Sequence, residues 1–255
     1  MAMTIKNASE IDKMHAAGRL VGEIHVRLRE AIAPGVTTAE LDRIAAEILA
    51  EHGATSSFLG YHGYPATICA SINEEIVHGI PGSRRLRAGD IVSIDVGAIL
   101  AGYHGDSAWT YPVGEISEDA ARLLRDTEAS LGLAIEAAKA GNRLGAVGAA
   151  VEQFAIPRGY GVIREYGGHG IGRRMHEDPH VPNHGQPDRG PVLRLGLTLA
   201  IEPMLTSGGE TTRQLDDGWT VVTADGSLAA HFEHTVVIGP EGGVILTERP
   251  VRVLH

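Results

Sequence analysis

The sequence predicts an α+β protein with an antiparallel sheet. Helical and strand-like hydrophobic patterns come in blocks, helices then strands and then helices and strands again, rather than in strict alternation. One strand-like segment also occurs twice, which indicates two related halves, roughly residues 1–115 and 116–255. Because no low-complexity linker separates the halves, we expect a single domain over residues 1–255, with two pseudo-symmetric lobes that share a central sheet.

Two helices open the first half. Ser9 is expected to cap a helix whose apolar residues continue at helical spacing until Pro34-Gly35 stops it. Thr37 or Thr38 caps a second helix, which ends at Gly53.

Strands complete the first half, beginning with a short one near residues 67–72. Residues 91–99 and 107–113 then read as two strands around a glycine-rich connection. Only ten residues lie between Asp95 and Asp106, so a hairpin would place both carboxylates side by side.

The second half repeats this order. Ser117 opens a long helix through Ile135, and another helix is expected from about Ala146 to Phe154. We interpret the glycine-rich residues 168–172 as a turn that orients His169. The remaining pattern predicts strands at residues 162–165, 197–202, 219–223 and 231–238.

The duplicated segment carries the main functional signal. Asp90-Ile-Val-Ser-Ile-Asp95 returns as Leu197-Thr-Leu-Ala-Ile-Glu202, and each copy follows a Leu-Arg-x-Gly sequence. A His-Gly-Ile triplet lies upstream of each copy, starting at His78 and at His169. A further carboxylate follows each copy at the head of the next apolar run: Asp106 and Glu233.

Four carboxylates on strand-like segments indicate a metal site. An isolated buried carboxylate is very costly, and like charges raise each other's pKa, so bound divalent cations are the natural compensation. For any single acid, an arginine partner or a turn cap would be the simpler explanation. Oxygen-rich clusters with imidazole suit paired ions that activate water. We therefore predict two divalent ions (cobalt, manganese, iron or zinc) held by Asp95, Asp106, His169, Glu202 and Glu233.

A second histidine motif matches a known zinc-binding pattern but is not interpreted as one. His176-Glu-Asp-Pro-His180 matches the His-Glu-x-x-His pattern of zinc proteases, which requires a helix. Pro179 removes a helical N–H, so we reject that interpretation and keep His176 as a neutral hydrogen-bond donor near His169. Ser107 is a poor candidate nucleophile, since the residues after it continue a strand.

Composition limits the function classes. The net charge of −10 argues against DNA binding, and the lack of any long apolar run argues against a membrane protein. The single cysteine, Cys69, excludes an internal disulfide and, without a signal peptide pattern, predicts a cytoplasmic protein. Two small arginine clusters, at residues 84–87 and 173–174, are interpreted as solvated, with a weak ribosome contact as the alternative.

The chain resembles the methionine aminopeptidases of type I, in their short bacterial form. The resemblance covers nearly the whole chain and implies a pita-bread fold, in which two α+β lobes cradle a dinuclear site. It rests on Gly60–Pro65, Ser71–Pro81, Asp90–Ala98, Gly105–Ser107, Gly167–Gly172, Ala200–Met204 and Phe232–Thr235.

The resemblance also implies how the acids are used. Asp106 and Glu233 would bridge both ions, Asp95 would bind one ion, and His169 and Glu202 would complete the other. Glu202 would accept a proton from the attacking water.

Two further roles follow from the resemblance. His78 and His176 would lie beside the scissile bond, as catalytic residues that also contact the substrate. Spacing alone favours a core role for the remaining set, which the resemblance instead assigns to a pocket for the methionine side chain: Tyr61, Tyr64, Cys69 and Trp219. Phe58 and Met175 depart from residues common in the family and affect the shape of that pocket.

The activity implied is removal of the N-terminal methionine from nascent proteins and peptides when the second residue is small, by a monomeric enzyme. Two alternatives share the fold. Aminopeptidase P and prolidase act at proline and usually carry an additional N-terminal domain, and a non-enzymatic binding member typically loses metal ligands. All five ligands are present here.

Overall fold

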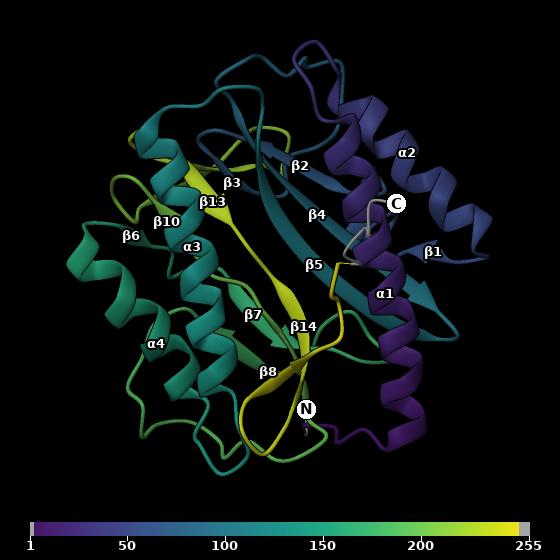
Figure 1. The fold of residues 1–255 in the computed structure, drawn as a ribbon, viewed down its shortest axis with the longest axis vertical. Coiled ribbons are helices and arrows are strands. Elements are labelled where there is room, and N and C mark those ends of the chain that lie inside the picture. The colour runs from purple at the N-terminus through teal and green to yellow at the C-terminus, as the bar shows by residue number, and fades with distance from the viewer. Residues whose placement is uncertain (1–2, 250–255) are drawn as a thin grey trace, which may run out of the picture.

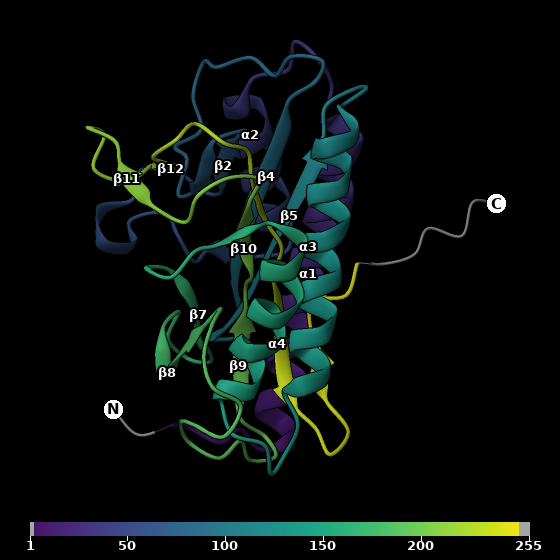
Figure 2. The same ribbon diagram turned by 90° about the vertical axis from the view of Figure 1, so that its left-hand side faces the viewer.

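The computed structural model describes residues 3–249, which form an α+β molecule with antiparallel sheets. Figure 1 shows α1 (Ala8–Ala31) and α3 (Glu118–Ala137) on either side of the central strands. The perpendicular view places both helices on one side of the molecule and β7 (Gly167–Gly170) on the other (Figure 2). The predicted fold class is therefore confirmed. No helix among the described residues is long and apolar enough to cross a membrane.

Both predicted N-terminal helices are present, with one correction to their caps. The cap of α1 is Asn7 rather than Ser9, because Asn7 and Glu10 exchange side-chain and backbone hydrogen bonds in a complete capping box. Thr37 caps α2 (Thr38–Glu51) as predicted, with Glu40 as its capping-box partner.

The predicted hairpin is confirmed, although its turn is tighter than expected. β4 (Ile91–Leu100) and β5 (Tyr103–Pro112) are joined by two residues only, so two of the glycines assigned to the connection lie within the strands. In the antiparallel register, Asp95 is opposite Ala108 and Gly97 is opposite Asp106. The two acids are thus diagonal neighbours on the same face of the hairpin.

The other strands of the first half complete this sheet or join a later one. β1 (Thr55–Ser56) and β2 (Cys69–Ile72) both pair with β4. The 3-10 helix η1 (Tyr61–Gly63) lies between them, and β3 (Glu75–Val77) pairs instead with β12 (Val221–Thr223).

The second half contains α4 (Gly145–Ala155), as predicted, and the larger second sheet. Residues 168–172 were expected to be a turn, and this is wrong for most of them. Gly167–Gly170 form β7, which pairs with both neighbours, and a Cβ on Gly168 would lie 2.2 Å from the Ala200 carbonyl oxygen. The strand order of the second sheet is β15 (Gly243–Ile245), β14 (His234–Ile238), β9 (Thr198–Ile201), β7 and β8 (Glu177–Pro182).

Two predicted strands are interrupted, each at an acid. Residues 231–238 divide into β13 (Ala229–His231) and β14, with Glu233 in the break. Residues 197–202 end as β9 before Glu202, and the chain resumes as β10 (Met204–Thr206). In both places the chain passes from one sheet to another, because β10 pairs with β13 while β9 pairs with β14.

The shorter elements form the edges of the molecule. β10 also pairs with β6 (Gly161–Val162), which is shorter than the predicted strand, and β12 also pairs with β11 (Thr212–Gln214). The 3-10 helix η2 (Ile156–Arg158) extends α4.

Hydrogen bonds tie the two halves together at the seam between β5 and β14. The Asp106 amide donates to Thr235 Oγ1 at 3.0 Å, and the Glu233 amide donates to the Ala108 carbonyl at 2.8 Å. Ser107 Oγ donates to the Glu233 carbonyl at 2.6 Å. One hydrophobic core, with residues such as Ile94 and Val236, runs through both halves.

The close contact between α1 and β5 gives a test of this packing. A Cβ on Gly105 would lie 2.7 Å from the Gly18 amide nitrogen, so the strand and the helix backbone touch. We expect Gly105→Ala to lower the free energy of unfolding by about 1–3 kcal/mol through overpacking. Gly132→Ala, on the open face of α3, should instead raise it by up to about 1 kcal/mol. Urea unfolding measures both, and equal effects of the two substitutions would contradict the packing.

Candidate metal centre

The five predicted metal-binding residues lie together around one cavity of about 210 Å³. Asp95 and Asp106 come from the hairpin and His169 from β7. Glu202 and Glu233 come from the two strand interruptions. Distant parts of the chain therefore deliver one oxygen-rich cluster with an imidazole.

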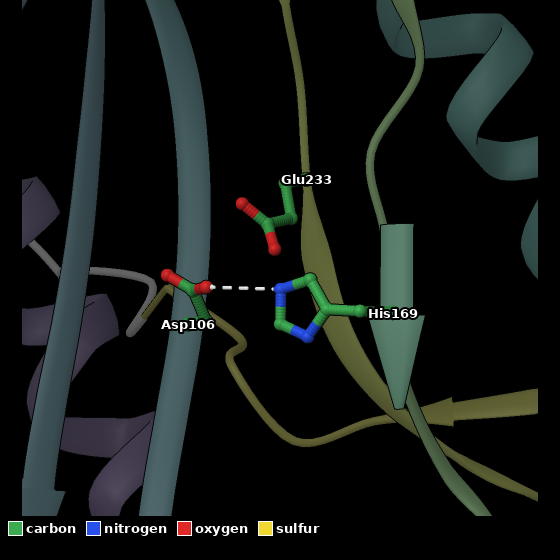
Figure 3. Close-up of side chains that lie close together, drawn as sticks. All are labelled: Asp106, His169 and Glu233. Carbon is green, nitrogen blue, oxygen red and sulfur yellow. Dashed lines mark ion pairs between the residues drawn. The ribbon is translucent and has the colours of Figure 1, made fainter. Parts of the chain in front are cut away.

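Three of these side chains have donor atoms within 4.8 Å of one another: Asp106, His169 and Glu233. Figure 3 shows them pointing toward a common point. His169 Nε2 lies 3.7 Å from Asp106 Oδ2 and 3.9 Å from Glu202 Oε1. His169 Nδ1 is 2.9 Å from the Gly170 carbonyl oxygen, which can only accept. In the neutral imidazole Nδ1 therefore carries the proton, and the Nε2 lone pair faces the acids.

The carboxylates are poorly compensated by protein groups. Asp95 Oδ1, Asp106 Oδ1 and Glu233 Oε1 are buried and have no hydrogen-bond partner within residues 3–249. Burial raises the pKa of both Asp95 and Glu233 well above the ordinary range, and the neighbouring charges of Asp106 and Glu202 raise it further. Such a cluster lacks positive charge, and its mixed oxygen and nitrogen donors fit divalent cations.

Glu202 differs from these acids. Burial opposes its ionisation, but the close approach of His231, followed by that of His169 and His176, lowers its pKa below the ordinary value. Carboxyl groups whose environments push their pKa values apart are suited to different roles. Among the four acids, only Glu202 has its pKa shifted in favour of the carboxylate.

The two predicted catalytic histidines also line the cavity. Burial, followed by the charge of His169, lowers the pKa of His176 to about 4, so this imidazole is neutral at neutral pH. Its Nδ1 lies 2.7 Å from the Tyr61 hydroxyl. Burial raises the pKa of Tyr61, so the phenol keeps its proton and donates a hydrogen bond to His176 Nδ1. The neutral imidazole therefore carries its own proton on Nε2, which is free to donate. Burial likewise lowers the pKa of His78.

The predicted pocket residues form an apolar wall beside the acids. The rings of Tyr64 and Trp219 meet edge to face at 5.0 Å, and the Tyr64 hydroxyl donates to the Gly79 carbonyl at 3.0 Å. Burial raises the pKa of the Cys69 thiol, which keeps it a neutral, polarisable wall group. The buried apolar cluster here consists of Phe58, Tyr64, Ala66, Cys69 and Met175, with Tyr61, Ile80 and Trp219 packed against it.

Three residues at this site were not predicted from the sequence. His62 lines the cavity, and Tyr166 packs edge to face on His78 at 5.9 Å between ring centres. His231 Nε2 lies 3.5 Å from Glu202 Oε2. The only sequence signal was the position of His231, two residues before Glu233.

A buried ion pair fixes the segment that carries Met175 and His176. Lys6 Nζ lies 2.7 Å from Glu177 Oε2, and both side chains are about 5% exposed. Glu177 Oε1 also accepts the Arg173 amide at 3.0 Å. The Lys6 side chain crosses Gly172 so closely that a Cβ there would lie 2.6 Å from Lys6 Cε. The N-terminal segment thus holds the loop that precedes β8.

An antiparallel α+β fold that encloses a buried cluster of acids and histidines defines a metal-dependent hydrolase. The comparisons agree: residues 12–240 match the model of metallopeptidase family M24, and the chain belongs to this family. It is 53% identical over 243 residues to a protein named methionine aminopeptidase from Clostridium perfringens, covering 95% of this chain and 98% of that protein.

Solved structures confirm the pita-bread fold. The crystal structure of methionine aminopeptidase from Thermotoga maritima has a TM-score of 0.95 and 46% identity, covering 97% of this chain and all of that chain. Xaa-Pro dipeptidase from Bacillus anthracis is more distant, with a TM-score of 0.77 and 24% identity. The match covers 97% of this chain but 63% of that dipeptidase, and it shows the fold alone.

The ion pair near His176 yields a prediction. Lys6→Met removes the charge that Glu177 faces, and we expect a loss of about 2 kcal/mol of stability, the cost of an under-satisfied buried group. Turnover should also fall, because the loop carrying His176 loses its anchor. Thermal unfolding and peptide hydrolysis measure these effects. Lys13→Met, at an exposed position of α1, is the matched control, and identical behaviour of the two variants would refute the anchor.

Proposed function

We infer that this chain is a metal-dependent methionine aminopeptidase, a hydrolase that removes the N-terminal methionine when the second residue is small. One observation carries this conclusion. Buried carboxylate oxygens without hydrogen-bond partners in residues 3–249 lie beside an apolar, aromatic pocket in a cavity of about 210 Å³. The acids suit divalent cations, and the pocket suits a thioether. The methionine aminopeptidases to which the chain is similar support the same activity.

The centre is proposed to hold two ions. Asp95, Asp106, His169, Glu202 and Glu233 would hold them. The mutual proximity of Asp106, His169 and Glu233 supports this arrangement. Donors of this type accept manganese, iron, cobalt or zinc, and availability decides among them.

The roles of the side chains follow from their protonation. Bound divalent ions supply Lewis acidity and lower the pKa of water. Glu202, held ionised, accepts the proton of the attacking water. His176 donates Nε2–H to the oxyanion that develops on the peptide carbonyl, as a preorganised neutral donor. His78, at the cavity wall, contacts the peptide backbone.

The methionine side chain is assigned to the aromatic end of the cavity. Tyr61, Tyr64, Cys69 and Trp219 line it with polarisable surface, which makes favourable contacts with sulfur. Phe58 and Met175 add further buried walls. The residues that form this end are apolar or aromatic, so a polar first residue would lose hydration with little compensation.

Other properties stay predictions. We expect one catalytic domain, a monomer, a cytoplasmic location and nascent N-termini as substrates. A weak ribosome contact through the arginine clusters is the least supported, since Arg84 already pairs with Glu75 at 2.6 Å and Arg85 donates to the Gly35 carbonyl.

Hydrolysis of two tripeptides tests the activity. Metal-stripped protein is assayed on Met-Ala-Ser and Ala-Pro-Ser, with and without added manganese or cobalt. We expect free methionine from the first peptide only, and only with metal. Cleavage of the proline peptide alone would mean that the pocket is misassigned. No cleavage by folded protein with any metal would favour a binding protein of the same fold.

A substitution separates catalysis from metal binding. His176→Ala removes a donor to the oxyanion but no proposed ligand, so metal affinity should stay unchanged while kcat falls about 10²–10³-fold. Calorimetric titration with Mn(II) and steady-state kinetics measure both. The exposed His180, four residues further on, gives the control variant His180→Ala, which should behave as wild type. Parallel loss of metal and activity in His176→Ala would contradict the assigned role.

A further inference from the structure

His231 is a buried imidazole at the metal centre that the mechanism above does not use. It is the last residue of β13 and is 2% exposed. Its backbone is fixed on both sides by Thr110 of β5, since the His231 amide donates to Thr110 Oγ1 and Thr110 Oγ1 donates to the His231 carbonyl, each at 2.9 Å. The direction of the side chain is therefore set by the seam between the two halves.

The ring nitrogen Nε2 faces the acids. It lies 3.5 Å from Glu202 Oε2 and 4.0 Å from Glu233 Oε2. It is also among the buried atoms that have no hydrogen-bond partner in residues 3–249, together with carboxylate oxygens of the proposed ligands. A buried polar nitrogen in this position must donate to a carboxylate or bind the metal itself.

The two oxygens of Glu202 face different histidines. Oε1 lies 3.9 Å from His169 Nε2, whose lone pair points toward the centre, so these two atoms are placed as two ligands of one ion. Oε2 faces His231 instead. A ring rotation that shortens the 3.5 Å separation by about half an ångström gives an ordinary N–H···O hydrogen bond.

We propose that His231 is a positioning residue: its Nε2–H donates to Glu202 Oε2 and leaves Oε1 for the ion shared with His169. The inference rests on the proposed metallopeptidase function and adds a residue that orients one ligand. Ligating carboxylates are themselves commonly held by hydrogen bonds, and these partners tune affinity and activity. His231 would also keep the Glu202 carboxylate correctly turned to accept a proton.

A direct metal bond from His231 is the competing assignment. His231 Nε2 lies nearer to Glu202 Oε2 than to Glu233 Oε2, at 3.5 Å against 4.0 Å. This close approach to one carboxylate oxygen favours a hydrogen-bond donor.

Two substitutions distinguish these assignments. His231→Leu removes the donor at similar volume, whereas His231→Gln keeps an N–H but removes the imidazole. Mn(II) binding to the metal-stripped variants is measured by calorimetry, the Co(II) forms by visible absorption, and hydrolysis of Met-Ala-Ser by kinetics. We expect His231→Leu to lose about 10–100-fold in affinity for one ion or in kcat, with an altered Co(II) spectrum. His231→Gln should largely restore all three.

A matched control removes another buried histidine. His234 Nδ1 lies 2.8 Å from Thr247 Oγ1, away from the cavity, so His234→Leu should leave Mn(II) affinity unchanged. If His231→Leu does not fold, His231→Ala replaces it in the comparison with wild type.

The outcomes separate the inference from the function. If wild-type protein binds Mn(II) and releases methionine, and His231→Leu has the same Mn(II) affinity, Co(II) spectrum and kcat, the inference is wrong while the function stands. If His231→Gln is as impaired as His231→Leu, the imidazole is a ligand, and the positioning role is overturned. A wild-type protein that binds no metal overturns both.

Discussion

The main physical constraint on this structure is that several acids share one buried cavity, where their negative charge needs compensation. Asp95, Asp106, Glu202 and Glu233 come from both halves of the chain, and one carboxylate oxygen of each of three of them has no hydrogen-bond partner in the described residues. Folding therefore brings like charges out of water and toward each other, which is unfavourable without cations. A protein keeps such an arrangement where function requires it, at a cost in stability.

The fold holds these acids in place with backbone interactions rather than with side-chain partners. The two hairpin acids follow from one register, and the two glutamates lie where the chain passes between sheets. Hydrogen bonds between β5 and β14 fix the seam, so the carboxylates converge while their oxygens stay free for ligands. The two histidines differ from the acids because protein groups hold their side chains. His169 and His176 each have one ring nitrogen in a hydrogen bond with a protein group, which leaves the other nitrogen available at the cavity. These hydrogen bonds preorganise the two imidazoles for their roles at the centre.

The sequence predicts much of this because its signals are local. The hairpin spacing and the repeated segment indicated which acids converge, and Pro179 correctly excluded a zinc-protease helix, since Glu177–Pro182 form a strand. Errors arose where several local patterns compete. Asn7 rather than Ser9 caps α1, and the glycines of residues 167–170 form a strand because close neighbours leave no space for side chains. His231 and the pair of Lys6 with Glu177 were missed, because such contacts join residues far apart in the chain and leave no periodic pattern.

The most direct test of the central claim compares wild type with the double variant Asp95→Asn and Glu233→Gln. Burial raises the pKa of both acids, so at neutral pH each lowers the stability of the metal-free fold, and neutral amides of the same shape remove that penalty. Urea unfolding of metal-free protein at pH 7 should show the double variant to be more stable than wild type. Added Mn(II) should stabilise wild type and leave the variant unchanged. A less stable metal-free variant, or one that still responds to Mn(II), would contradict the account.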